Sequence, residues 1–275
     1  MLTRIISGAI IFICILAMVI PGGYVLLGTT CIIAMIGFHE LYHALSGTID
    51  IKKPDSFEVV GLVGVAAWYA SIHFFGIALE SLCTIMAVLF LEMGLYVFRF
   101  PKFKCERAIE SVFAFIYCPV LLSFIYLTRE LPHGIWFVWL IFISSWISDT
   151  GAYFFGRALG KHKLAPVLSP KKSVEGAVAG VLSAALIGGI YGLVLKNMGF
   201  LTLPYQITMF AVIGGVGSIL SQLGDLCASG FKRDRGVKDY GKLIPGHGGI
   251  MDRFDSVIVT SPIIFALTFY LFPLA

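Results

Sequence analysis

Charge is scarce in this chain of 275 residues. Only 13% of the residues are charged and 58% are hydrophobic, and the mean hydropathy is +0.92. Because soluble globular domains carry about 25% charged residues, the composition excludes an ordinary soluble protein and predicts a polytopic membrane protein. The net charge of +4 is modest, and the basic residues lie in short loops between apolar runs. This distribution argues against nucleic-acid binding.

Paired cysteines and internal repeats are also lacking. The six cysteines form no C-x-x-C pair, and Cys14, Cys31, Cys83 and Cys118 lie within apolar runs, where a thiol usually packs as a small hydrophobe. We therefore expect neither a disulfide nor a cysteine zinc site. The lack of a convincing repeat disfavours transporter folds that are built from repeats.

Long apolar runs dominate what is there, and they predict an all-α fold with about nine transmembrane helices. The expected helices cover 4–20, 24–43, 59–76, 79–98, 109–127, 135–156, 174–195, 205–228 and 255–273. Pro21-Gly22-Gly23 predicts a tight turn between the first two. The first run could instead be a signal peptide, but no A-x-A site follows it. We expect N-terminal transmembrane helices over 1–133 and a C-terminal transmembrane catalytic region over 134–275.

Basic residues predict the orientation. With the N-terminus in the cytoplasm, eighteen of the twenty Lys and Arg residues fall in cytoplasmic segments, and only Arg129 and Lys196 fall outside. The positive-inside rule therefore favours an N-in, C-out protein. In this topology five carboxylates share one depth near the cytoplasmic side, and they are Asp149, Glu175, Asp225, Asp252 and Asp255.

A polar segment from Ser229 to Ser256, here called the signature segment, interrupts the apolar chain. It holds six Lys or Arg, four Asp and one His around a glycine-rich centre. Charged groups at membrane depth are costly, at roughly 2.5–3.5 kcal/mol each, so such density indicates function. Carboxylates bind divalent metal, basic side chains bind phosphate, and glycine lets backbone N–H groups approach phosphate. His247 lies between glycines, where a ligand could reach it for hydrogen bonding or proton transfer.

Two further stretches carry polar groups. One stretch has polar residues spaced by three and four positions, which predicts a helix face that points into the protein: Ser218, Ser221, Gln222, Asp225 and Ser229. This face could bind metal through Asp225, or could only form interhelical hydrogen bonds. Ser173 is a plausible helix N-cap, followed by Glu175 in the first turn. Lys171 and Lys172 beside this cap could bind phosphates, or could only mark the cytoplasmic side.

The stretch His39-Glu40-Leu41-Tyr42-His43 matches H-E-x-x-H, the pattern of zinc metalloproteases. The pattern has only three fixed positions, and the other histidines offer no obvious third ligand. We therefore favour a polar helix end over an intramembrane protease. Glu92 is buried by pattern, and the sequence leaves open whether it pairs with a basic loop residue or faces the site.

The signature segment closely resembles that of phosphatidate cytidylyltransferases, the CDP-diacylglycerol synthases. The matching positions are Ser229, Lys232-Arg233, Lys238-Asp239, His247-Gly248-Gly249, Asp252-Arg253 and Asp255, without a departure. The stretches SDTGAYFFGRALGK and SPKKSVEG are similar to the same family, so the likeness covers residues 144 to 256. The resemblance implies transfer of a cytidylyl group from CTP to phosphatidate with Mg²⁺, giving CDP-diacylglycerol and pyrophosphate. It matches the family's metal-site aspartates to Asp225 and Asp252, and it implies a possible homodimer.

From the residues and the resemblance together we assign candidate roles. The catalytic set is Asp225, Asp252, His247 and Lys238. The substrate-binding set is Lys171, Lys172, Arg233, Arg253, Ser169, Ser173 and Glu175, and the metal set is Asp225, Asp252, Asp149 and Asp255. The alternatives are a CTP-dependent lipid kinase, which would transfer the γ-phosphoryl group, an ion-coupled transporter and the zinc protease. We expect the enzyme in the cytoplasmic membrane, with its site at the cytoplasmic face.

Overall fold

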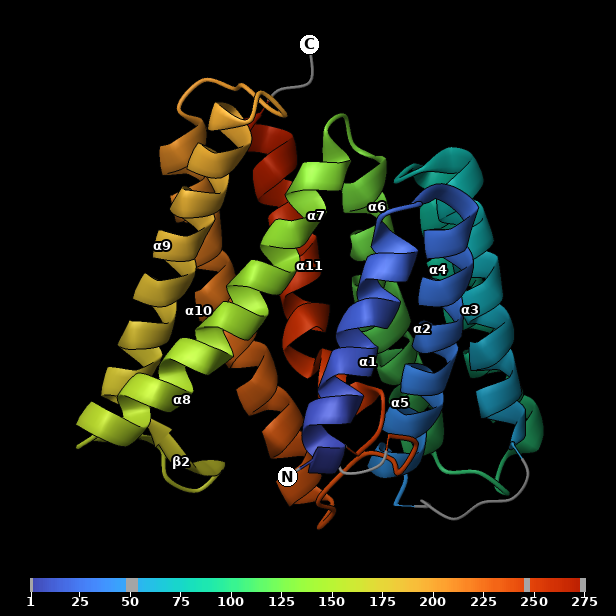
Figure 1. Cartoon of the computed structure of the whole chain (residues 1–275). Helices are drawn as coiled ribbons and strands as arrows, with labels where there is room; N and C mark the ends of the chain where they lie inside the picture. Colours follow the sequence, from blue (N-terminus) through green and yellow to red (C-terminus); the bar gives the residue numbers. More distant parts are fainter. Residues whose placement is uncertain (1, 48–53, 245–247, 273–275) are drawn as a thin grey trace. The chain divides into compact units, whose positions relative to one another are not determined.

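The computed structural model describes residues 2–47, 54–244 and 248–272, with the side chains of residues 2–6 left aside. Within these residues, eight helices are long and apolar enough to cross a membrane, and a shorter apolar helix lies near the N-terminus. The protein is thus an all-α, multi-pass membrane protein, as the composition predicts (Figure 1). The chain forms two compact units, which are described separately: residues 1–127 with 234–254, and residues 128–233 with 255–275.

Unit 1 contains the first half of the chain. Its helices are α1 (Leu2–Val19), α2 (Gly23–Leu45), α3 (Ser56–Phe75), α4 (Leu79–Arg99) and α5 (Cys105–Phe115), followed by the π-helical turn η1 (Ile116–Val120) and the start of α6 (Phe124–Glu130). Gly22 and Gly23 have φ of 65° and 48°, values that L side chains rarely adopt, so the predicted Pro21-Gly22-Gly23 turn is confirmed. Pro119 lies inside η1, where its missing N–H interrupts the helical ladder between α5 and α6.

Unit 2 contains α7 (Gly134–Phe142), the π-helical turn η2 (Ile143–Ile147), α8 (Ser148–Leu159), α9 (Val174–Asn197), α10 (Gln206–Asp234) and α11 (Met251–Leu271). The last residue of α10 and the first four of α11 belong to unit 1. A hairpin of β1 (Lys163–Ala165) and β2 (Ser169–Ser173) joins α8 to α9, with Lys163 opposite Ser173. This hairpin was not predicted, because its prolines and lysines are typical of a loop.

Small residues bring the helices of unit 2 close together. A Cβ atom on Gly180 of α9 would lie 2.8 Å from the carbonyl oxygen of Ser148, and one on Gly188 would lie 2.6 Å from that of Phe210 in α10. Lipid tails are as apolar as the helix side chains, so the hydrophobic effect gives helices in a membrane little reason to associate. Close backbone approach at small residues contributes to their packing instead. The polar face of α10 is confirmed in the same region, because Ser218 Oγ donates to Ser148 Oγ at 2.7 Å and Gln222 Nε2 donates to the carbonyl of Ala177 at 3.0 Å.

The predicted division of the chain at 133/134 stays a prediction. That division was a prediction of which half of the chain carries out catalysis. The compact units are defined by packing instead, and packing places residues 234–254 with the first half of the chain. The signature segment therefore contributes residues to both units.

Candidate functional site

A cavity of about 570 Å³ in unit 2, here called the basic cavity, gathers many of the predicted residues. α8 contributes Asp149 and Arg157, the hairpin and its junction with α9 contribute Lys163, Ser169, Lys171, Lys172 and Ser173, and α10 contributes Gln222 and Asp225. Ligand-binding pockets have volumes of about 300–1,000 Å³, so this cavity has room for a nucleotide-sized molecule. Four basic residues against two acidic ones make its wall suited to an anion.

Lys172 and Asp225 form the ionic centre of the basic cavity. The Lys172 ammonium contacts the Asp225 carboxylate, and the two side chains are about one quarter exposed. The hairpin therefore places a cation directly on the carboxylate for which the sequence predicts metal binding. Partial burial weakens solvent screening, so the two charges act strongly on each other and on a ligand that would replace one of them.

The start of α9 forms one end of the basic cavity. Ser173 is its N-cap, as predicted, and Ser173 Oγ accepts from the backbone N–H of Gly176 at 3.1 Å. The following N–H groups and the positive end of the helix dipole favour a phosphate at this end. Gly176 permits the close fit, because a Cβ atom there would lie 2.8 Å from the carbonyl oxygen of Ala152.

Glu175, in the first turn of α9, is bonded to the segment that precedes the hairpin. Its carboxylate accepts from the backbone N–H of Lys161 at 3.1 Å and bonds to His162 Nδ1 at 2.6 Å. These contacts fix the start of the hairpin to α9 and so position the lysines on β2. Substrate contact by Glu175 stays a prediction.

Asp255 is the third of the predicted metal residues that lie in unit 2, after Asp149 and Asp225. It interacts electrostatically with Asp225 and Asp149 and with the ammonium of Lys232. A Cβ atom on Gly224 would lie 2.9 Å from the Asp255 carbonyl oxygen, so α10 and α11 approach closely here. Predicted metal residues from three helices thus share one electrostatic environment.

Asp252 lies one turn earlier in α11, and it belongs to unit 1. Its Oδ2 accepts from the backbone N–H groups of Tyr240 at 2.8 Å and Gly249 at 3.1 Å. The carboxylate therefore organises the backbone of the signature segment. Asp252 and Asp255 are both helical, although the expected helix began only at Asp255, and His247 lies outside the described residues.

The basic residues of the signature segment are divided between the units. Arg233 is exposed near the end of α10 in unit 2, and Arg253 is exposed in the unit 1 part of α11. Lys238 lines a second cavity, of about 580 Å³, in unit 1, here called the loop cavity. The remaining walls of the loop cavity come from α2 and from residues 237–243.

The H-E-x-x-H stretch lies on α2 beside the loop cavity. Glu40 is buried, and its Oε2 accepts from the backbone N–H of Met251 at 2.8 Å. His39 and His43 both contact Glu58 of α3, a residue that sequence reasoning missed. An acidic residue in the first turn of the next helix was the available signal, because consecutive helices joined by a short loop bring their facing ends together.

The structure gives Glu92 a hydrogen-bond partner within unit 1. Glu92 is fully buried in α4, and its Oε1 accepts a hydrogen bond from Ser111 Oγ of α5 at 2.8 Å. It therefore ties α4 to α5, and among the described residues no ion pair joins it to a basic side chain.

A cavity lined by basic residues, carboxylates and a helix N-terminus, in a chain with membrane-length helices, is typical of the class of membrane enzymes that handle phosphate groups. Comparison with known proteins is more specific: the profile of the Cytidylyltransferase family matches residues 2–271. The chain is 32% identical over 270 residues to a phosphatidate cytidylyltransferase of Staphylococcus saprophyticus, and 32% identical over 265 residues to one of Staphylococcus aureus strain COL. Each match covers 96% of this chain and 97% of the relative. The chain belongs to the Cytidylyltransferase family.

Proposed function

We propose that this protein transfers the cytidylyl group of CTP to phosphatidate, releasing pyrophosphate and forming CDP-diacylglycerol for phospholipid synthesis. Full-length similarity to relatives named for this activity supports the proposal. The observation that carries it in this chain is the basic cavity, where Lys171, Lys172 and the N-terminus of α9 share a lining with Asp225, whose carboxylate contacts Lys172.

The chemistry needs positioning more than proton transfer. A phosphatidate phosphate is already anionic at neutral pH, so its oxygen can attack the α-phosphorus of CTP without a strong base. A new P–O bond forms as the bond between the α-phosphorus and its bridging oxygen breaks, and pyrophosphate leaves. Lys171 and Lys172 would hold phosphate oxygens, and the capped start of α9 would bind the departing anion.

The carboxylates of unit 2 suit a hard divalent cation, which prefers oxygen ligands. Asp149, Asp225 and Asp255 interact within one environment, and the Lys172 ammonium already takes a cation's place beside Asp225. We propose that Asp225, supported by Asp149 and Asp255, holds Mg²⁺. The ion would neutralise the charge that develops on the phosphate oxygens. Metal binding by Asp252 stays a prediction from the family resemblance.

The charge asymmetry supports an orientation. We propose a cytoplasmic-membrane protein with its N-terminus inside and its site at the cytoplasmic face, where CTP is present. This assignment rests on the eighteen-to-two split of basic residues between the two sides. A homodimer stays a prediction from the resemblance.

Labelled CTP tests the reaction. Purified protein with Mg²⁺, phosphatidate and CTP labelled at the α-phosphate should move label into the lipid fraction, and this transfer should depend on phosphatidate. CTP labelled at the γ-phosphate should release its label as pyrophosphate. Appearance of γ-label in lipid, with α-label left as water-soluble CDP, would identify a lipid kinase and refute the proposal.

A further inference from the structure

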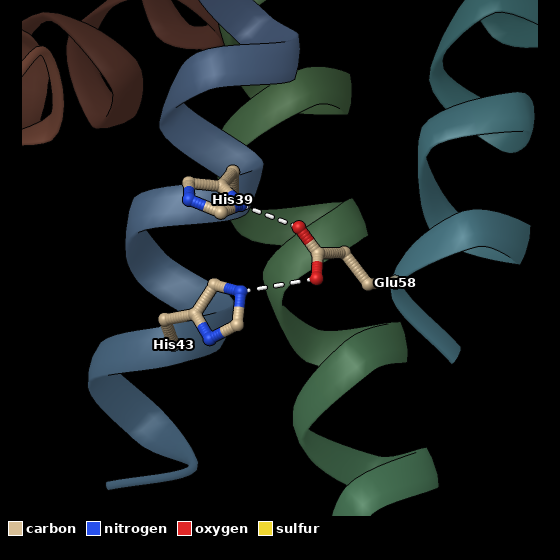
Figure 2. Close-up of side chains that lie close together, drawn as sticks. All are labelled: His39, His43 and Glu58. Atoms are coloured by element: carbon tan, nitrogen blue, oxygen red, sulfur yellow. Dashed lines mark hydrogen bonds and ion pairs between the residues drawn. The ribbon is translucent and has the colours of Figure 1, made fainter. Parts of the chain in front are cut away.

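Three side chains in unit 1 form a cluster that the cytidylyl-transfer chemistry does not use. His39 and His43 are one helical turn apart on α2, with ring centroids 4.4 Å apart, and Glu58 reaches them from the first turn of α3 (Figure 2). Glu58 Oε1 contacts His39 Nδ1, and Glu58 Oε2 lies 3.0 Å from His43 Nε2. One ligand atom from each residue can be chosen so that all three lie within 4.8 Å of one another.

We propose that His39, His43 and Glu58 bind a transition-metal ion, and that Zn²⁺ fits this site best. Two imidazoles and one carboxylate are a ligand set that zinc uses, and three protein ligands leave a fourth position for water. Ligand atoms about 2.0–2.1 Å from a tetrahedral ion lie about 3.3 Å from one another. The observed spacing reaches up to 4.8 Å, so a bound ion would draw the three side chains together by rotation about their side-chain bonds.

Burial supports a bound cation. The side chains of Glu58 and His43 are 2% and 7% exposed, so the carboxylate has little access to water. A buried carboxylate is unfavourable unless a positive charge compensates it, and a divalent ion bound between the three side chains would do so. His39 is 51% exposed and lines the loop cavity with His43, which gives an ion a route to the site.

Neighbouring residues hold the cluster in place. Asp55 is the N-cap of α3, and its Oδ1 accepts from the backbone N–H of Glu58 at 2.9 Å. Tyr42, which lies next to His43 in α2, donates its hydroxyl to Asp55 Oδ2 at 2.7 Å. The end of α2 and the start of α3 are therefore already joined, so a metal ion would meet preorganised ligands.

The same geometry argues against a protease. In the H-E-x-x-H mechanism the glutamate acts as general base on a metal-bound water. Here the Glu40 carboxylate is buried and accepts from the Met251 backbone, and a Cβ atom on Gly249 would lie 2.3 Å from its Oε2. Because Glu40 is committed to the signature segment, it is not available as the general base of such a protease.

Metal binding can be measured without turnover, so the test is independent of the proposed function. Full-length protein in detergent would be stripped with a chelator, incubated with Zn²⁺ or Co²⁺, separated from free metal, and analysed for bound ion. We expect about one Zn²⁺ per chain that excess Mg²⁺ does not displace, and Co²⁺ should give the visible spectrum of a tetrahedral site.

Variants distinguish the cluster from adventitious binding. Glu58→Gln keeps a carbonyl oxygen that can accept hydrogen bonds from the histidines but loses the charge, and His39→Ala removes a half-exposed side chain, so both should fold. Each should weaken zinc affinity at least about tenfold and abolish the rise in melting temperature that zinc gives the wild type. His73→Ala is the matched control, because His73 instead bonds to the Tyr126 hydroxyl in the same unit. Wild-type protein without stoichiometric zinc, or cluster variants that bind zinc as the wild type does, would overturn the proposal.

Discussion

Asp252 provides both a hydrogen-bond acceptor and a negative charge, and substitution can distinguish the effects of the two. Its Oδ2 accepts from the backbone N–H groups of Tyr240 and Gly249, and the residue is only 7% exposed. Asparagine offers a carbonyl oxygen in the same place without the charge, whereas alanine offers neither. Comparing the two variants therefore distinguishes a role in folding the signature segment from a role in turnover.

The structure sets the expected magnitudes. In Asp252→Ala two buried N–H groups lose this acceptor, at about 1–3 kcal/mol each, so the free energy of unfolding should fall by about 2–6 kcal/mol. Asp252→Asn should lose less, because neutral hydrogen bonds replace charge-assisted ones of about twice the strength. If the charge also serves catalysis, both variants should lower turnover at least about 10²-fold.

Two assays decide the matter: thermal unfolding in detergent, and transfer of label from the α-phosphate of CTP to lipid. Asp234→Asn is a suitable control, because the Asp234 side chain is 81% exposed at the end of α10. An Asp252→Asn protein that keeps more than about a tenth of the wild-type rate would show that the charge is dispensable. An Asp252→Ala protein as stable as the wild type would refute the structural part of the reasoning.

Three further predictions test the cavity and the topology. Asp225→Asn should lower turnover at least about 10²-fold without unfolding the protein; activity above about a tenth of wild type would remove this carboxylate from the mechanism. Gly176→Ala should lower both melting temperature and activity, because its new methyl would press on the backbone of α8, whereas Gly94→Ala, in open space, should change neither. Similar behaviour of the two alanine variants would contradict the close packing of α8 and α9. In a cysteine-free background, an impermeant thiol reagent should label Lys196→Cys in intact cells and Lys102→Cys only after permeabilisation; the reverse pattern would invert the proposed orientation.

The helices were predictable because one physical quantity, hydropathy over a membrane's thickness, determines them. The expected run 24–43 corresponds to Gly23–Leu45, and 174–195 corresponds to Val174–Asn197. The ends were less accurate in polar regions. α10 continues to Asp234 and α11 begins at Met251, because charged residues at a helix end can stay helical outside hydrocarbon.

The sites were predictable in their residue types but less so in their partners. Charge density and glycines marked the signature segment, and Ser173 followed from capping chemistry. The pairing of Lys172 with Asp225 depends on a hairpin that hydropathy does not reveal. Glu58 was missed because its contact with His39 depends on how α2 and α3 pack, which periodicity alone does not specify.

Acidic and basic side chains in and around the signature segment differ in burial and in their partners, which composition alone does not reveal. Two buried carboxylates, those of Glu40 and Asp252, accept hydrogen bonds from backbone N–H groups of the signature segment. This segment is rich in glycine, so it has few side chains with which to pack. Arg233, Lys238 and Arg253 are exposed instead. Because Glu40 and Asp252 are engaged with the backbone, we expect the positive charge of these exposed bases to be available to an anionic ligand. The acidic half of this charge density thus serves folding, and the variants of Asp252 test whether it also serves turnover.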